Sequence, residues 1–202
     1  MNAFFSKAAT VACNPSNPRN APVFPILGIF PAGAKSAKPF RFVNQPMRKL
    51  LKLKNYDLHA VTTRHGDRCN ANIVAWIMQT SRTPVLITLA LEKSDFTLSL
   101  IEQSGLLVIN LLSTAQTRLI RRFGQISGHA RDKIRPGDLA FLPSGAPYLP
   151  ASIGYIECQT EHFADSGDHR LVVARPLTQK VLHPDAEVLT YQRVRELGLI
   201  RG

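Results

Sequence analysis

Short apolar stretches separated by turn residues dominate the chain after residue 55. The run 84–91 (PVLITLAL) is nearly continuous, rich in β-branched residues and shorter than most helices, so it predicts a buried strand. The same reasoning, with turn residues at the boundaries, predicts further strands at residues 56–63, 70–79, 106–112, 153–163, 169–181 and, more briefly, around 188–192. The hydrophobic pattern therefore indicates a mainly β fold.

Two segments carry helical signals instead. Ser94 and Asp95 supply an N-cap signal before an apolar stripe, and Gly105 follows as the residue after the helix. A second helix is predicted from a hydroxyl cap at residues 113–114 to Gly124. Two short helices are too few for the regular alternation of a doubly wound sheet, so a closed antiparallel barrel is the natural alternative.

Two proline-rich segments break this pattern. Prolines recur through residues 1 to about 45, where they interrupt any helix or central strand, and four more between residues 131 and 150 predict a long loop. We therefore divide the chain into an N-terminal extension or leader, residues 1–50, and a folded domain, residues 51–202.

The net charge of +11 belongs mainly to the extension. The first acidic residue is Asp57, and nine basic residues precede it, whereas sixteen basic and fourteen acidic residues share the rest of the chain. A basic arm can bind phosphate backbones without sequence preference, but this one carries few aromatic side chains for stacking on bases. A nucleic-acid function is thus not expected, and no apolar run approaches the roughly 18 residues of a membrane-spanning helix.

Two interpretations of the extension remain open. Its lack of acidic residues is typical of an organelle transit peptide, although its serine and arginine content is modest. Its apolar residues equally suit an arm packed on the barrel or on a partner subunit. The expected location is accordingly the cytoplasm, or a plastid or mitochondrion if the extension is a transit peptide.

Common catalytic motifs are missing from the sequence. It contains no GxGxxG after a strand, no P-loop, no GxSxG and no HExxH. Cys13, Cys69 and Cys158 are odd in number and far apart, so we expect reduced thiols and neither a disulfide framework nor a metal site.

Several local motifs occur in a fixed order over roughly residues 55–195. They are Val61-Thr62-Thr63, the segment 70–81 (NANIVAWIMQTS), Lys93-Ser94 with Thr97, the segment 104–112 (SGLLVINLL), Arg121-Arg122-Phe123-Gly124 with Ser127-Gly128 and Asp132-Lys133, Gly167-Asp168-His169, and Leu189-Thr190-Tyr191. Together they resemble the flavin reductase-like, FMN-binding split-barrel family. The resemblance implies a Greek-key split β-barrel with two short peripheral α-helices, and residues 189–191 as its closing strand.

The sequence departs from the family pattern at three positions. Ala75 stands where a hydroxyl residue often precedes the tryptophan, Val85 replaces the second proline of a pair, and Leu107 replaces an aromatic residue. These departures weaken the assignment of individual side-chain contacts more than that of the fold.

The resemblance also implies a set of site residues. His169 is the candidate catalytic residue, and the candidate cofactor-binding residues are Thr63, Asn70, Asn72, Ala75, Trp76, Ser81, Lys93, Ser94, Thr97, Phe123, Gly124 and His169. Asn110 is expected to fasten a strand end.

Each of the most informative positions has a structural alternative. Lys93 and Ser94, at a helix N-terminus, suit a flavin phosphate but also an ordinary capped surface helix. Trp76 is either a flavin contact or a packing residue, and His169 either faces flavin and nicotinamide or simply opens a strand.

The expected function is an NAD(P)H:flavin oxidoreductase that uses FMN, with FAD or riboflavin as alternatives, and NADH or NADPH as the donor. Two alternatives stay open: a flavin-binding electron carrier reduced by a redox partner protein, and a colourless binding protein on the same barrel. A homodimer is expected, because the family builds its flavin pocket across or beside a subunit interface.

Overall fold

The computed structural model describes residues 48–51 and 53–200. The proposed extension, residues 1–50, lies outside the described residues except for its end, where the one-turn helix α1 (Arg48–Leu51) begins. Among the described residues, no helix combines the length and apolar character needed to cross a membrane.

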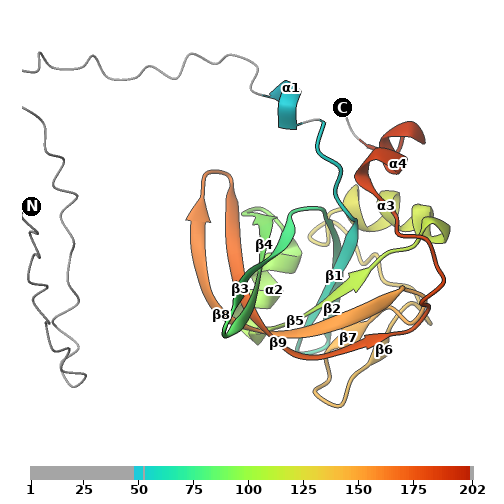
Figure 1. Ribbon diagram of the computed structural model, residues 1–202. Helices are drawn as coiled ribbons and strands as arrows, with labels where there is room; N and C mark the ends of the chain where they lie inside the picture. Colours follow the sequence, from blue (N-terminus) through green and yellow to red (C-terminus); the bar gives the residue numbers. More distant parts are fainter. Residues whose placement is uncertain (1–47, 52, 201–202) are drawn as a thin grey trace, which may run out of the picture. The chain divides into compact units, whose positions relative to one another are not determined.

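Seven strands form one antiparallel sheet in the order β2-β1-β5-β8-β9-β4-β3 (Figure 1). The strands are β1 (His59–His65), β2 (Arg68–Val74), β3 (Ile77–Arg82), β4 (Val85–Glu92), β5 (Leu106–Leu111), β8 (Gly154–Ser166) and β9 (His169–Val181). The strand that the apolar run predicts corresponds to β4, whose alternate side chains are buried. The expectation of a mainly β protein is confirmed.

The sheet curls around a single apolar core. Side chains from both halves of the strand order meet there, for example Val61 of β1, Leu89 of β4 and Val172 of β9. The helix α2 (Phe96–Ser104) adds Leu98 and Ile101 to the same cluster. Because strands from opposite ends of the order share one interior, the sheet has the barrel-like curvature that the sequence predicts.

A second apolar cluster lies under the other helices. The 3-10 turn η1 (Thr114–Gln116) leads into α3 (Thr117–Gly124), whose Ile120 and Phe123 are buried. Val194 of α4 (Tyr191–Glu196) joins them in this cluster, and Figure 1 shows α3 and α4 close together at one end of the sheet. The hydroxyl cap is Ser113, which forms a reciprocal capping box with Gln116.

The structure corrects three predicted elements. Residues 70–79 are not one strand, because the chain breaks at 75–76 and continues as β3, which pairs with β4. The proline-rich segment 131–150 contains the short strands β6 (Ala140–Phe141) and β7 (Pro147–Tyr148). Between residues 182 and 200 the described chain contains no strand, and Val188 and Thr190 form isolated bridges with Ser113 and Asp57.

The closing strand predicted around residues 188–192 is therefore wrong, and so is the total of two helices. Thr190 serves instead as the N-cap of α4, since its side chain accepts a hydrogen bond from the Arg193 N–H. Threonine is among the residues preferred at a helix N-cap.

The longest feature is the hairpin of β8 and β9. Its turn contains Gly167 with φ of 62°, a conformation that favours glycine. Register shifts interrupt the pairing between Glu157 and Cys158 and between Thr160 and His162. β9 begins and ends where the sequence predicts, which places His169 directly after the turn.

Candidate functional site

The structure brings Trp76, Lys93 and His169 together. β4 lies between β3 and β9, so Glu92 at its end is paired with His169, and the Lys93 N–H donates to the Asp168 carbonyl over 3.0 Å. The Ala90 N–H donates to the Trp76 carbonyl, also over 3.0 Å. We call Trp76, Lys93, Ser94 and His169 the candidate site.

Trp76 and His169 form an aromatic pair. Their ring centroids lie 4.9 Å apart and their planes are tilted by 42°. Trp76 is 53% exposed although it is a large aromatic residue, and the His169 side chain is 25% exposed. An indole left open to solvent beside a partly covered imidazole provides a flat apolar surface with a polar neighbour.

Asp168 fixes the orientation of the imidazole. Its Oδ1 lies 2.7 Å from Nδ1 of His169, and this hydrogen bond, with the charge of the ring, holds the pKa of the Asp168 carboxyl below its ordinary value. A carboxylate on Nδ1 selects the tautomer with its proton there, which leaves Nε2 as the atom available to a ligand.

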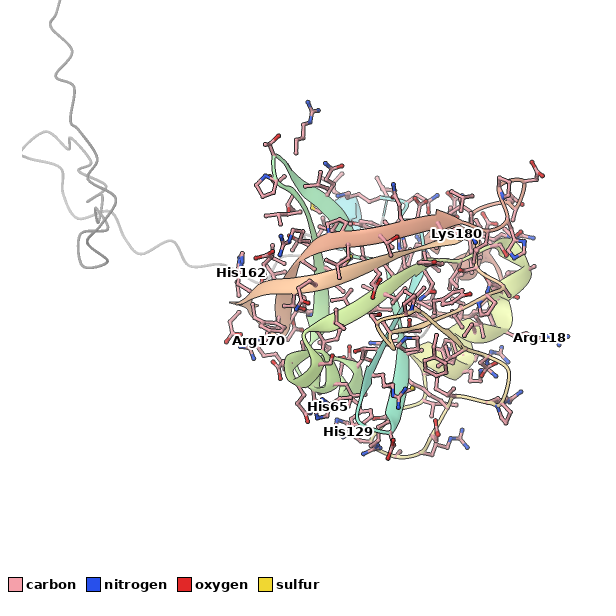
Figure 2. All side chains as sticks on the ribbon, turned by 90° about the horizontal axis from the view of Figure 1, so that it is seen from below. His65, Arg118, His129, His162, Arg170 and Lys180 are labelled. Atoms are coloured by element: carbon pink, nitrogen blue, oxygen red, sulfur yellow. The ribbon has the colours of Figure 1, made fainter. Side chains whose placement is uncertain are left out.

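The Lys93 ammonium has a carboxylate partner. Its Nζ lies 3.2 Å from Oδ2 of Asp165 on β8, and the Lys93 side chain is 44% exposed. Arg170, which Figure 2 shows at the hairpin end of the molecule, lies 3.6 Å from the other oxygen of Asp165. An anion that binds Lys93 would therefore compete with, or share, this ion pair.

The N-terminus of α2 is not capped by a side chain. Asp95 is its N-cap residue, yet its carboxylate makes no capping bond and instead accepts a hydrogen bond of 2.6 Å from Nδ2 of Asn72. Burial raises the pKa of Asp95 above its ordinary value, with Glu92 adding to the effect. Ser94 is exposed beside these first helical N–H groups, which remain suited to an anion.

Lys133 is a residue of this region that the predicted site set missed. It is 7% exposed, and its Nζ donates to the carbonyls of Phe123 and Ile126 over 2.8 and 3.0 Å. Burial lowers its pKa to about 8, against the opposing charge of Asp95. The signal that could have found it is its place in the Asp132-Lys133 motif.

Three predicted cofactor residues are buried and bonded to protein atoms. Nδ2 of Asn70 donates to Oγ1 of Thr97 over 2.9 Å, and Oγ1 of Thr63 donates to the Leu106 carbonyl over 2.7 Å. Each is 3% exposed or less. The Asn70 contact links β2 to α2, and the Thr63 contact links β1 to the start of β5.

The remaining predicted residues contribute to packing or lie at the far end of β3. The Phe123 ring is fully buried in the second cluster and has no surface to offer a ligand, and a Cβ on Gly124 would meet Ile73 at 3.3 Å. Ala75 packs against the same cluster, and Ser81 lies at the far end of β3, paired with Leu86.

The residues present suit a flavin. Its ring system needs a flat apolar wall, which the open face of Trp76 supplies, and its phosphate needs donors and a cation, which Ser94, the α2 N-terminus and Lys93 supply. The described residues contain no group of His, Cys, Asp and Glu side chains placed to hold a metal ion.

Comparisons with known proteins agree with this chemistry. The family model described as "Flavin reductase like domain" matches residues 56–198. The protein of Nostoc sp. named diflavin flavoprotein A 6 is 29% identical over 137 residues, which cover 67% of this chain but 24% of that protein. HsaB of Rhodococcus jostii, the reductase subunit of a flavin-dependent monooxygenase, is 29% identical over 112 residues, which cover 55% of this chain and 56% of HsaB.

A solved structure supports the fold independently. The FMN-binding protein of Thermus thermophilus superposes with a TM-score of 0.65 at 20% identity, over 75% of this chain and 82% of that one. The chain spans less than two thirds of both curated relatives, so their whole activities do not transfer to it. With the family model covering most of its length, this chain belongs to the flavin reductase-like domain family.

Proposed function

We propose that this chain is an NAD(P)H-dependent flavin reductase that uses FMN, with FAD or riboflavin as alternatives. The observation that carries the proposal is the half-exposed Trp76 ring in contact with His169, beside the uncapped N-terminus of α2. The flavoprotein and reductase names of the relatives support it at the level of the family.

In this proposal each residue of the candidate site has a separate task. Trp76 provides the wall for the flat ring system, while Lys93 and Ser94 hold the phosphate with the first N–H groups of α2. His169, whose Nδ1–H is directed to Asp168, presents Nε2 as a hydrogen-bond acceptor to the flavin edge or to the nicotinamide.

The bound flavin would accept a hydride directly from the reduced nicotinamide, which requires no acid–base pair from the protein. The protein's contribution is to hold one ring with an open face and admit the other ring at van der Waals contact. That division of work explains why the candidate site contains no catalytic triad and no facing carboxylates.

An absorbance spectrum of the purified full chain, followed by a nicotinamide oxidation assay with added FMN and then FAD, tests the proposal. We expect flavin bands or tight FMN binding, and consumption of NADH or NADPH that depends on flavin. Failure to oxidise either nucleotide with either flavin would refute the reductase function.

The second candidate is a flavin-binding electron carrier without its own nicotinamide site. The diflavin flavoprotein favours this candidate. The region that matches this chain makes up only 24% of that protein, so it accompanies other parts there. A carrier would bind flavin and accept electrons from a partner protein, yet react slowly with NAD(P)H. A protein that binds no flavin in calorimetry would instead select the colourless binding protein.

A further inference from the structure

A cavity lined by arginines opens beside α3. Its volume is about 480 Å³, and its lining residues are Arg118, Leu119, Arg121, Arg122, Ile126 and Arg135. Figure 2 shows Arg118 and Arg170 at opposite ends of the molecule, and Arg170 directly follows His169 of the candidate site. This arginine cavity is therefore separate from the proposed flavin site.

The positive charge of the arginine cavity is largely unbalanced. Asp138 pairs with Arg122 over 2.8 Å, but within the part of the chain that the structure describes no carboxylate forms an ion pair with Arg118, Arg121 or Arg135. On α3, Arg118 stands three and four residues before Arg121 and Arg122, so like charges repel along one helix face. A bound anion would relieve this repulsion.

The Arg122 guanidinium is fixed in position beside the cavity. Its Nη2 donates to Oδ1 of Asp138, and its guanidinium lies 4.8 Å from the centre of the Phe123 ring. Oδ2 of Asp138 accepts a hydrogen bond of 2.6 Å from the Arg135 N–H, which ties the loop to the helix. The buried Nε of Arg122 has no hydrogen-bond partner among the described residues, so one donor of this fixed group is unused.

From these features we infer that the arginine cavity binds a phosphate-bearing small molecule of nucleotide size. Guanidinium groups match phosphate oxygens with paired donors, and several converge here from α3 and the loop that follows it. Leu119 and Ile126 provide apolar contact for the body of the ligand, and the volume lies within the usual range for small-molecule pockets. A concave site of this size fits a small ligand better than a protein surface.

Calorimetric titration of the full chain with ADP, in about 0.15 M salt to screen loose charge attraction, tests the inference. We expect saturable binding that pyrophosphate competes with and adenosine does not. Arg121→Gln and Arg118→Gln remove exposed guanidiniums without disturbing the core, and each should weaken ADP binding on the order of tenfold.

Two variants serve as matched controls. Arg131→Gln removes an equal charge from an exposed position outside the cavity, and Lys93→Gln removes a cation from the candidate site. Arg131→Gln should leave ADP affinity unchanged, whereas a loss of ADP affinity in Lys93→Gln would place ADP at the candidate site and overturn the inference. Absence of ADP binding, an equal loss in Arg131→Gln, or adenosine binding as tightly as ADP would each overturn the inference.

Discussion

At the scale of single residues, the candidate site depends on pairs rather than on isolated groups. His169 is oriented by Asp168 and packs against Trp76 at a tilt, while Lys93 is joined to the same hairpin through Asp165. A substitution of one member therefore changes the position of its neighbour as well as its own chemistry. The contribution of each residue is best measured from the rate of NAD(P)H oxidation together with the affinity for flavin.

His169→Ala should slow flavin-dependent NAD(P)H oxidation by roughly tenfold or more, because an oriented hydrogen bond and a stacking partner are lost. Steady-state kinetics measures the effect, with circular dichroism as evidence that the fold is intact. His162→Ala, at an exposed position on the same hairpin, is the control and should behave like the unmodified chain. Equal rates for both variants would remove His169 from the mechanism.

Lys133 should make stability depend on pH. Its pKa falls from 10.5 to about 8 in the folded chain, so between these values the unfolded chain binds the proton more than the folded chain does. The contribution of Lys133 to stability therefore rises as the pH increases through this window. The free energy of unfolding of the unmodified chain, minus that of Lys133→Met, should increase by about 1–2 kcal/mol from pH 7 to pH 9.5.

Urea unfolding of both proteins at the two pH values measures this gain, and taking the difference cancels the other titrating groups. Cys158 is one such group, since burial raises its pKa to about 12 and its effect has the opposite sign. A difference between the two proteins that stays constant with pH would contradict the assignment.

At the scale of elements, the end of α2 combines two constraints in one glycine. Gly105 has φ of 68°, and a Cβ there would lie 2.9 Å from Nε2 of Gln159, which donates to the Gly105 carbonyl. The helix stops here because the left-handed conformation turns the chain into β5. The position of α2 relative to β8 therefore depends on this residue.

Gly105→Ala should lower the free energy of unfolding by about 2 kcal/mol, from backbone strain together with the displaced Gln159 side chain. Gly66→Ala is a matched control, because Gly66 has φ of 57° and nothing lies within 4 Å of its would-be Cβ. Gly66→Ala should lower the free energy of unfolding by about 1 kcal/mol, from backbone strain alone. Equal losses in chemical denaturation would show that the Gln159 contact is unimportant.

Elements with a single clear periodicity could be predicted from the sequence. β4, β9 and α2 carry an apolar run, a turn signal or a cap on each side, and Asn110 fastens its strand as expected by donating to the Ala60 carbonyl. The break at residues 75–76 and the helix α4 could not be predicted, because pairing with β4 and burial of Val194 decide them. Long-range contacts of that kind leave no local pattern.

The candidate site, too, could be predicted from the sequence only in part. Residues in loops and at element ends, such as Lys93, Trp76 and His169, meet where the ordered motifs imply. Motif membership does not distinguish a ligand contact from a packing residue, which is why Phe123 and Thr97 entered the predicted set although both are buried.

At the scale of the whole molecule, the outer surface retains exposed apolar side chains. Leu177 and Val181, four residues apart on one strand, are 51% and 65% exposed, and Met78 on β3 is 65% exposed. Exposed apolar groups of this size are typical of surfaces that contact another chain. We propose that the chain forms a homodimer.

Sedimentation equilibrium of the full chain should then give a mass of twice the 22.4 kDa of one chain. Val181→Lys should shift the equilibrium toward monomer, because it places a charge in the apolar contact. Leu197→Lys, at an exposed position on a different element, is the control. A monomer for the unmodified chain at all concentrations would refute the homodimer.

The contact between Trp76 and His169 has a practical consequence, because Trp76 is the only tryptophan in the chain. Indole emission then originates from this one ring and is sensitive to whatever covers it. The chain thus carries an intrinsic fluorescent probe at the place where a flavin would stack, and occupancy could be followed in solution without attaching a dye.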